Sequence, residues 1–248
     1  MSIWLGVFLG IIQGLTEFLP VSSSGHLILF QYLFDITDDM LLFNIILHVA
    51  TLLAVVIVFR KKIWQLIKKP FNKINLCLLI STAITCAFVL MFRDFIESTF
   101  THRVLPVTFL ITAILLFITS FVKLQEKPVG FFSATIVGFT QFLAVTPGIS
   151  RSGATISTLL LTGTKREDAA EYSFLMSIPI IIASLVYEVL RVGSDASIDI
   201  APTIFAFIAA LLSGIIAIKF MLNIIKRVKL HWFSFYLVVL AIICFIIL

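Results

Sequence analysis

Two stretches of the chain, residues 13–26 and residues 141–155, decide how it folds. The first reads QGLTEFLPVSSSGH and the second reads QFLAVTPGISRSGAT. In each, a proline cuts an apolar run and serines follow, which predicts a helix that ends, a turn, and a new helix capped by serine. The surrounding segments, 3–34 and 130–163, are too interrupted for either half to span a bilayer, so we expect two re-entrant hairpins.

The composition places most of the chain in lipid. Of the 248 residues, 60% are hydrophobic and 12% are charged, whereas soluble domains carry about 25% charged residues. The net charge of +5 comes from short basic clusters between apolar runs, which is typical of membrane topology signals. We therefore expect membrane lipid as the surroundings and no nucleic-acid partner.

Six further apolar runs are each long enough to cross a bilayer as a helix. They are residues 41–59, 74–92, 104–122, 171–190, 201–222 and 231–248. The expected fold class is an all-α polytopic membrane protein, with one integral membrane domain over residues 1–248.

The two interrupted segments resemble each other at an offset of 128 residues, which predicts an internal repeat. The aligned identities are Gly10 with Gly138, Gln13 with Gln141, Leu15 with Leu143, Ser22 with Ser150, Ser24 with Ser152, Gly25 with Gly153 and Ile28 with Ile156. The halves 1–127 and 128–248 would each hold one hairpin and three spanning helices. Because three is odd, the second half is expected to be inverted relative to the first, as in many transporters.

The distribution of basic residues predicts the orientation of these halves. The loop after residue 59 is expected in the cytoplasm, with Arg60, Lys61, Lys62, Lys68, Lys69 and Lys73. The same side would receive Lys123, Lys127, Lys165, Arg166, Lys219, Lys226, Arg227 and Lys229, against Arg93, Arg103 and Arg191 opposite. Both termini would then face outward, and the first hairpin would enter from outside.

The first hairpin carries an acid, three serines and an imidazole. Gln13 and Glu17 are four residues apart and share one helix face. Ser22, Ser23 and Ser24 precede the next helix, whose first turn holds Gly25 and His26. Hydroxyls and free N–H groups at a helix N-terminus are suited to an anion.

The second hairpin carries an arginine where the first has its middle serine. Arg151 lies between Ser150 and Ser152, after Gly148 and before Thr155 on the same helix face. A guanidinium binds phosphate oxygens in a bidentate manner and is costly at membrane depth without a partner. Simpler readings stay open: serine and glycine for helix packing, a structural Glu17–Arg151 ion pair, and a hydrogen-bonded core histidine.

These motifs resemble those of the undecaprenyl-pyrophosphate phosphatase family, the BacA/UppP type linked to bacitracin resistance. That family carries (Glu/Gln)-x-x-x-Glu, then Pro-x-Ser-Ser-x-Gly-His, and later Pro-Gly-x-Ser-Arg-Ser-x-x-Thr. Here these are Gln13 to Glu17, Pro20 to His26, and Pro147 to Thr155. The similarity covers nearly the whole chain.

The resemblance implies an inner-membrane enzyme that removes the terminal phosphate of undecaprenyl diphosphate and so recycles the lipid carrier for peptidoglycan. It implies a loosely bound divalent cation, Mg²⁺ or Ca²⁺, and a site open to the outer, periplasmic side. Glu17 is the metal ligand we expect. Position 13, where the family accepts Glu or Gln, is Gln13 here, which weakens the case for a metal ligand at that position. A homodimer is compatible with the sequence.

Three assignments of the nucleophile follow from the parts available. The first has Ser23 attack phosphorus while His26 and Glu17 handle protons and Arg151 clamps the diphosphate. The second makes His26 the nucleophile, and the third uses water activated by a cation on Glu17. Ser22, Ser24, Gly25, Gly148, Ser150, Ser152, Thr155, Gln13 and Gln141 are expected around the substrate. His48, within a spanning helix, is expected to be structural.

The rival function is transport of a lipid phosphate. Inverted repeats with broken helices serve many transporters, and a flippase would also need an anion site at the membrane midplane. A transporter would need Arg151 and the helix starts, but not Ser23, His26 and Glu17 together.

Overall fold

The computed structural model of the chain describes residues 1–36, 40–122, 126–190, 199–226 and 230–248. Within these ranges the chain is helical, apart from turns and an isolated β-bridge between Lys127 and Thr164. Four residues of the orientation prediction, Lys123, Arg191, Arg227 and Lys229, lie outside the described residues.

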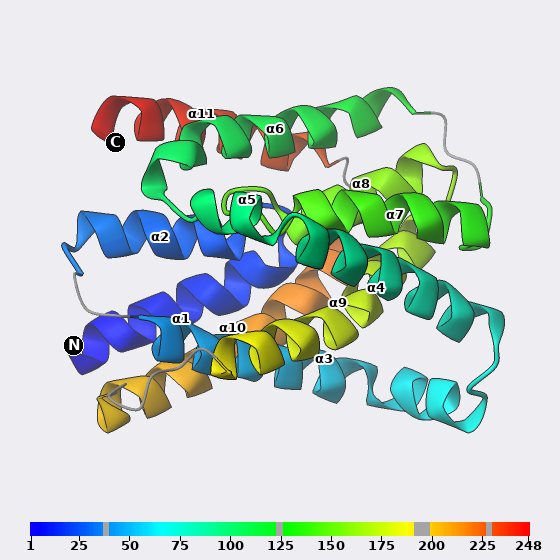
Figure 1. The fold of residues 1–248 in the computed structure, drawn as a ribbon, viewed down its shortest axis with the longest axis horizontal. Helices are drawn as coiled ribbons and strands as arrows, with labels where there is room; N and C mark the ends of the chain where they lie inside the picture. Colours follow the sequence, from blue (N-terminus) through cyan, green and yellow to red (C-terminus); the bar gives the residue numbers. More distant parts are fainter. Residues whose placement is uncertain (37–39, 123–125, 191–198, 227–229) are drawn as a thin grey trace.

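Eleven α-helices and two short 3₁₀ helices are found in the described ranges (Figure 1). They are α1 (Ile3–Phe18), α2 (Ser23–Leu33), α3 (Leu41–Lys68), α4 (Lys73–Met91), α5 (Arg93–Ser98), η1 (His102–Val104), α6 (Leu105–Ile118), η2 (Thr119–Phe121), α7 (Phe131–Leu143), α8 (Arg151–Leu161), α9 (Arg166–Val189), α10 (Ile200–Ile224) and α11 (His231–Ile247).

Five segments are long and apolar enough to cross a membrane, which confirms the polytopic class. They are Leu41–Lys68, Lys73–Met91, His102–Phe121, Arg166–Tyr187 and Ile200–Ile224. The sixth expected run forms α11, whose 17 residues place it among the shorter apolar helices. At 1.5 Å per residue α11 is about 26 Å long, just under the hydrocarbon thickness.

Both interrupted segments form helical hairpins, as the sequence predicts. In the first, α1 gives way at Leu19, which is extended (φ −75°, ψ 147°) because the following Pro20 disfavours helical backbone. In the second, α7 ends before Pro147 and Gly148, and Gly148 takes a left-handed φ of 87°. Figure 1 shows α1–α2 at one end of the bundle and α7–α8 at the other, with their turns near the middle.

Small residues let each hairpin pack closely on a long helix. Helix α1 packs on α10, and α7 packs on α4. A Cβ atom added at Gly6 would lie 2.7 Å from the carbonyl oxygen of Pro202, and Gly10 faces the same helix. A Cβ atom at Gly138 would lie 2.8 Å from the carbonyl oxygen of Ser81. Backbones that approach this closely are typical of membrane helix interfaces.

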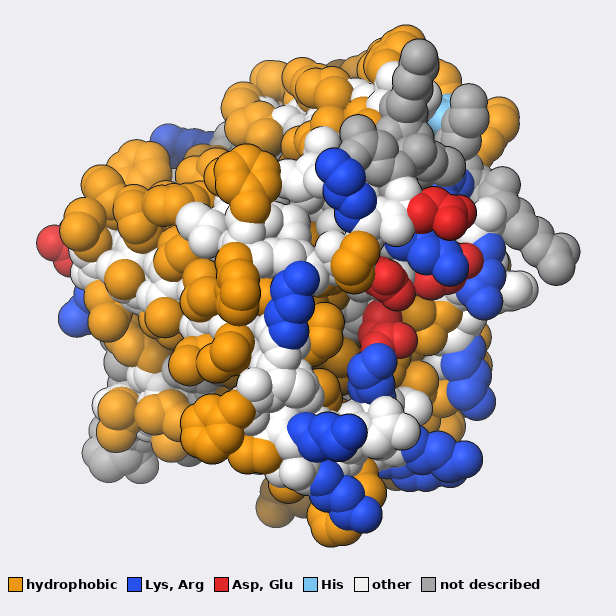
Figure 2. Space-filling model, turned by 90° about the vertical axis from the view of Figure 1, so that its right-hand side faces the viewer, with side chains coloured by type: hydrophobic (Ala, Val, Ile, Leu, Met, Phe, Trp, Pro, Cys, Tyr) orange, Lys and Arg blue, Asp and Glu red, His pale blue; other side chains and the backbone are white. Residues whose placement is uncertain are grey.

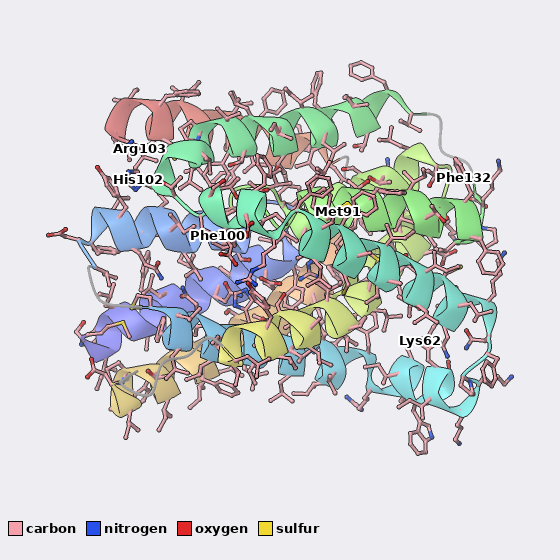
Figure 3. All side chains as sticks on the ribbon, in the orientation of Figure 1. Lys62, Met91, Phe100, His102, Arg103 and Phe132 are labelled. Carbon is pink, nitrogen blue, oxygen red and sulfur yellow. The ribbon has the colours of Figure 1, made fainter. Side chains whose placement is uncertain are left out.

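Charged residues gather at one end of the molecule. Figure 2 shows lysine, arginine, aspartate and glutamate side chains across the end where α3 leads into α4. The Lys62 ammonium lies 2.6 Å from the Glu171 carboxylate there. Figure 3 labels Lys62 toward this end, and His102 and Arg103 toward the opposite end, beside α2.

Candidate active site

The turns of the two hairpins touch each other inside the bundle. A Cβ atom added at Gly25 would lie 2.9 Å from the Cα atom of Gly148, and one added at Gly153 would lie 3.2 Å from Cβ of Pro20. The Ser152 hydroxyl donates a hydrogen bond of 3.0 Å to the carbonyl oxygen of Leu19. The chain therefore brings residues more than 120 positions apart into one site.

Glu17 is the centre of the contacts at this site. It is 7% exposed, and its Oε2 atom accepts hydrogen bonds from Gln13 Nε2 at 3.0 Å and from Ser23 Oγ at 2.5 Å. Its Oε1 atom forms an ion pair with Nη2 of Arg151. A single carboxylate thus holds the serine of the first hairpin and the arginine of the second.

Arg151 keeps hydrogen-bonding capacity that no protein group uses. Its side chain is 14% exposed, and its Nη1 atom is buried with no hydrogen-bond partner among the described residues. A buried donor without a partner costs free energy. A guanidinium with one arm on a carboxylate and the other unpartnered is suited to hold an oxygen of a phosphate.

Two helix N-termini begin at this site. The Ser22 hydroxyl caps α2 by accepting from the Gly25 N–H group at 3.3 Å, and the Ser150 hydroxyl caps α8 by accepting from the Gly153 N–H group at 3.0 Å. Each N-terminus carries partial positive charge from the helix dipole. Together with Arg151, the two ends favour an anion between the hairpins.

In each hairpin, the serine two residues after the capping serine lies beside it. The Ser24 hydroxyl is 3.5 Å from that of Ser22, and the Ser152 hydroxyl is 3.3 Å from that of Ser150. Ser24 is half-buried, whereas Ser152 is buried. The two pairs therefore repeat one local geometry at the two turns.

His26 forms its hydrogen bonds with groups other than Glu17 and Ser23. Its Nδ1 atom is 2.7 Å from the carbonyl oxygen of Ser22, and its Nε2 atom is 2.7 Å from the Tyr236 hydroxyl. Both ring nitrogens are thus occupied, and neither contacts Ser23 or Glu17. Of the two proton-handling groups expected for Ser23, the structure brings Glu17 into contact and not His26.

Thr155 and Gln141 are engaged away from the Glu17 centre. The Thr155 hydroxyl donates to the carbonyl oxygen of Arg151 at 2.8 Å and lies 2.6 Å from the Ser173 hydroxyl. Gln141 Nε2 donates to Thr85 Oγ1 at 3.2 Å, on the face of α7 that packs on α4. Thr155 therefore braces the first turn of α8, and Gln141 belongs to a helix interface.

Two residues near the site, Thr112 and Tyr236, carry no motif that would have marked them. Thr112 accepts a hydrogen bond from the Ser150 N–H group at 3.0 Å and donates to the Gly148 carbonyl at 3.2 Å, so it holds the second turn. Tyr236 reaches His26 from the last helix. His48, expected to be structural, has its Nδ1 atom 2.8 Å from the carbonyl oxygen of Asn44 on its own helix.

Comparison with known proteins identifies the family. The model of the family described as "Bacitracin resistance protein BacA" matches residues 6–243. The chain belongs to this family. It is 42% identical to the undecaprenyl-diphosphatase of Carboxydothermus hydrogenoformans, with 98% of this chain and 96% of that protein aligned. It is 40% identical to the undecaprenyl-diphosphatases of Treponema denticola, over 97% and 96%, and of Korarchaeum cryptofilum, over 98% of each. The resemblance predicted from the two hairpin motifs is confirmed.

The BacA-type site offers few ligands for a resident metal ion. No group of three or more histidine, cysteine, aspartate or glutamate residues gathers anywhere in the described part of the chain. Gln13, however, has a buried Oε1 atom with no hydrogen-bond partner within the described ranges, and its Nε2 atom donates to the Glu17 carboxylate. An amide oxygen and a carboxylate are hard oxygen donors of the type that Mg²⁺ and Ca²⁺ prefer. These two residues fit a cation that takes its remaining ligands from water and from a bound diphosphate.

Proposed function

We infer that the chain is a membrane phosphatase that hydrolyses undecaprenyl diphosphate to undecaprenyl phosphate and inorganic phosphate. Membership of the BacA family and the many relatives named undecaprenyl-diphosphatase support this function. The observation that carries it is the 2.5 Å contact of the Ser23 hydroxyl with Glu17, beside the unpartnered arm of Arg151.

In the first step, Ser23 Oγ attacks the terminal phosphorus of the diphosphate. Glu17 Oε2, already 2.5 Å from this hydroxyl, takes its proton. A bond forms between Oγ and phosphorus, and the bond from phosphorus to the bridging oxygen breaks. Undecaprenyl phosphate leaves with the electron pair of that bond, and the phosphoryl group stays on Ser23.

In the second step, water attacks the phosphoserine and inorganic phosphate leaves. The Ser23 oxygen recovers a proton from Glu17, and the proton lost by the water passes to a phosphate oxygen and leaves with inorganic phosphate, so Glu17 is again a carboxylate. The net reaction consumes one water molecule and restores the site.

Charge on the transferring group is stabilised by the second hairpin. Arg151 Nη1 has no hydrogen-bond partner in the described part of the chain and would donate to a phosphoryl oxygen. The first N–H groups of α8 lie next to Ser150 and Arg151, because α8 starts at Arg151, and such N–H groups have no acceptor within their own helix. The first hairpin thus supplies the nucleophile and the second supplies the positive charge.

We expect a divalent cation to bind with the substrate at Glu17 and the Oε1 atom of Gln13. A bound cation would neutralise charge on the diphosphate oxygens. Gln13 also holds Glu17 through its Nε2 atom, and its Oε1 atom is buried without a hydrogen-bond partner among the described residues. Since the protein contributes few ligands, the affinity in the absence of diphosphate should be low.

We propose that the two halves, 1–127 and 128–248, are inverted repeats. The pairing of α1 with α10 and of α7 with α4 supports this, because the first hairpin helix of each half packs on the second spanning helix of the other. The gathering of basic residues at the end where α3 leads into α4 supports a cytoplasmic location for that end. The site would then open to the outer face of the inner membrane, with both termini outside.

The polyprenyl tail would lie among lipid-facing side chains of the bundle. Large apolar residues such as Phe132 (72% exposed), Leu79 and Ile216 cover the outside of the helices. Moving the tail from lipid to such a surface costs little, because both are hydrocarbon. A homodimer is not required for the chemistry, since one chain supplies Glu17, Ser23 and Arg151.

Phosphate release from undecaprenyl diphosphate by the purified protein in detergent tests this function. We expect release by the wild type with Mg²⁺ or Ca²⁺, loss in Ser23→Ala and Arg151→Ala, and inhibition by a chelator. The matched control is Ser177→Ala, which should stay active, because Ser177 is a buried serine on α9 whose hydroxyl donates to the Phe174 carbonyl of its own helix. No release by folded wild type with either cation would overturn the proposal and favour lipid-phosphate transport.

A further inference from the structure

Tyr236 on α11 binds the buried face of the first hairpin. Its hydroxyl is 2.7 Å from His26 Nε2, and the two rings are stacked with planes 7° apart and centroids 5.8 Å apart. His26 is 2% exposed, and Phe109 makes an edge-on contact with its ring, with centroids 5.7 Å apart. The imidazole is therefore fixed in orientation by two aromatic rings and by a hydrogen bond at each nitrogen.

The partners of the imidazole define its tautomer. The carbonyl oxygen of Ser22 is only an acceptor, so His26 Nδ1 carries the proton and donates to it at 2.7 Å. In the neutral ring, Nε2 is then the acceptor, and Tyr236 donates its O–H to it. Tyr236 thereby selects the tautomer that can brace Ser22.

Ser22 has an unusual backbone conformation that such a brace would hold. Its φ is 72°, a left-handed value that non-glycine residues adopt rarely. Its counterpart in the other hairpin, Ser150, has a φ of −74°, and the residue four positions after it is Ala154 instead of a histidine. The strained serine and the histidine occur together in one hairpin, and both are missing from the other.

The residue that follows Ser22 is Ser23, whose hydroxyl contacts Glu17. A change in the backbone dihedral angles of Ser22 would move the Ser23 side chain directly. Strained backbone that persists at a site requires surrounding contacts that hold it. The contacts run from Tyr236 to His26 Nε2, and from His26 Nδ1 to the Ser22 carbonyl.

We propose that Tyr236 is a positioning residue for Ser23, acting through His26. This inference rests on the proposed phosphatase function with Ser23 as the nucleophile. Tyr236 holds His26 so that its Nδ1–H braces the Ser22 carbonyl, which keeps Ser23 on Glu17. His26 then has a structural task in the reaction and forms no bond to phosphorus.

Amide side chains at position 26 distinguish two roles of His26: a hydrogen bond to the Ser22 carbonyl, and direct participation of the imidazole in the reaction. Asparagine places an N–H donor near the position of imidazole Nδ1, whereas glutamine reaches the position of Nε2. We expect His26→Asn to retain kcat within about tenfold of wild type, and His26→Gln to lose about a hundredfold, since a small misplacement at a reacting group has that effect. A nucleophilic or proton-transferring imidazole would be lost equally in both variants.

Removal of the tyrosine hydroxyl tests the hydrogen bond from Tyr236 to His26. Tyr236→Phe should lower kcat about tenfold with KM nearly unchanged, and should have no further effect in the His26→Asn protein, whose shorter side chain does not reach Tyr236. Tyr172→Phe is the matched control, because the Tyr172 hydroxyl is 2.6 Å from Ser81 Oγ at the helix packing between α9 and α4. It should change the melting temperature and not kcat.

Two results would overturn the positioning role of Tyr236 while the phosphatase function stands. They are full kcat in Tyr236→Phe, or equal loss of kcat in His26→Asn and His26→Gln. Absence of phosphate release by the wild type would instead overturn the proposed function. Melting temperatures of all variants, measured in the same detergent, identify any loss that comes from unfolding.

Discussion

The two hairpins share a frame and differ at the positions that carry chemistry. In both, a helix ends shortly before a proline, a serine caps the next helix, and that serine lies close to another one. In the aligned sequences, however, Glu17 corresponds to Val145, and Ser23 corresponds to Arg151. The acid and the nucleophile lie on one hairpin and the cation lies on the other.

This difference explains how a repeat gives one site rather than two. Only the first hairpin has a carboxylate, so the aligned glutamines have different fates: Gln13 binds Glu17, and Gln141 binds Thr85 on a neighbouring helix. The turns also differ, because the left-handed residue is Gly148 in the second and Ser22 in the first. In the first turn, the strained residue Ser22 is next to the nucleophile Ser23. In the second turn, Gly148 adopts its positive φ without the strain that a side chain would cause.

The largest effect is expected for the residue that forms the bond to phosphorus. Ser23→Ala should lower phosphate release by at least about a thousandfold, as loss of a nucleophile does in other hydrolases. Release measured in detergent, with the melting temperature of each protein, checks this. Near-normal release by Ser23→Ala would show that water or His26 attacks instead.

Arg151 should matter both for rate and for stability. Arg151→Ala should lower release by about a hundred- to a thousandfold, and should destabilise the fold by about 3 kcal/mol because Glu17 is left as a buried charge without its partner. Adding Glu17→Gln should recover much of the stability and none of the activity. If the double variant is no more stable than Arg151→Ala, the ion pair does not hold the two hairpins together.

Close contact between the hairpin turns is tested by glycine substitution. In Gly25→Ala the new methyl group would lie 2.7 Å from the Phe109 ring and 2.9 Å from Gly148 Cα, so the turns must separate. We expect a loss of about 1–3 kcal/mol in stability and a lower kcat. Gly130→Ala is the control, since a Cβ atom there meets nothing within 4 Å; similar effects of the two changes would argue against tight contact of the turns.

The smallest contrast separates the two buried glutamines. Gln13→Ala should lower kcat by about tenfold, because Glu17 loses one of its hydrogen bonds, and should raise the cation concentration needed for half-maximal rate. Gln141→Ala should alter the melting temperature alone. A cation titration of both variants would contradict this contrast if it found the same change in each.

The parts of the fold that follow from local chemistry could be predicted from the sequence. The apolar runs, the breaks at Pro20 and Pro147, and the serine caps depend on nearby residues. Long-range contacts do not have such a signal, so the bond from Tyr236 to His26 was missed. The same limit applies to Gln141, whose alignment with Gln13 suggested the site although its contacts are with α4.

The central claim is that Ser23 attacks phosphorus while Arg151, from the other hairpin, holds the phosphoryl group. The most direct test is a single turnover with substrate labelled at its terminal phosphate, quenched rapidly and followed by peptide mapping. The account predicts a transient label on Ser23 that is absent in Ser23→Ala. A label on His26, or product formed at the full rate with no label on the protein, would contradict it.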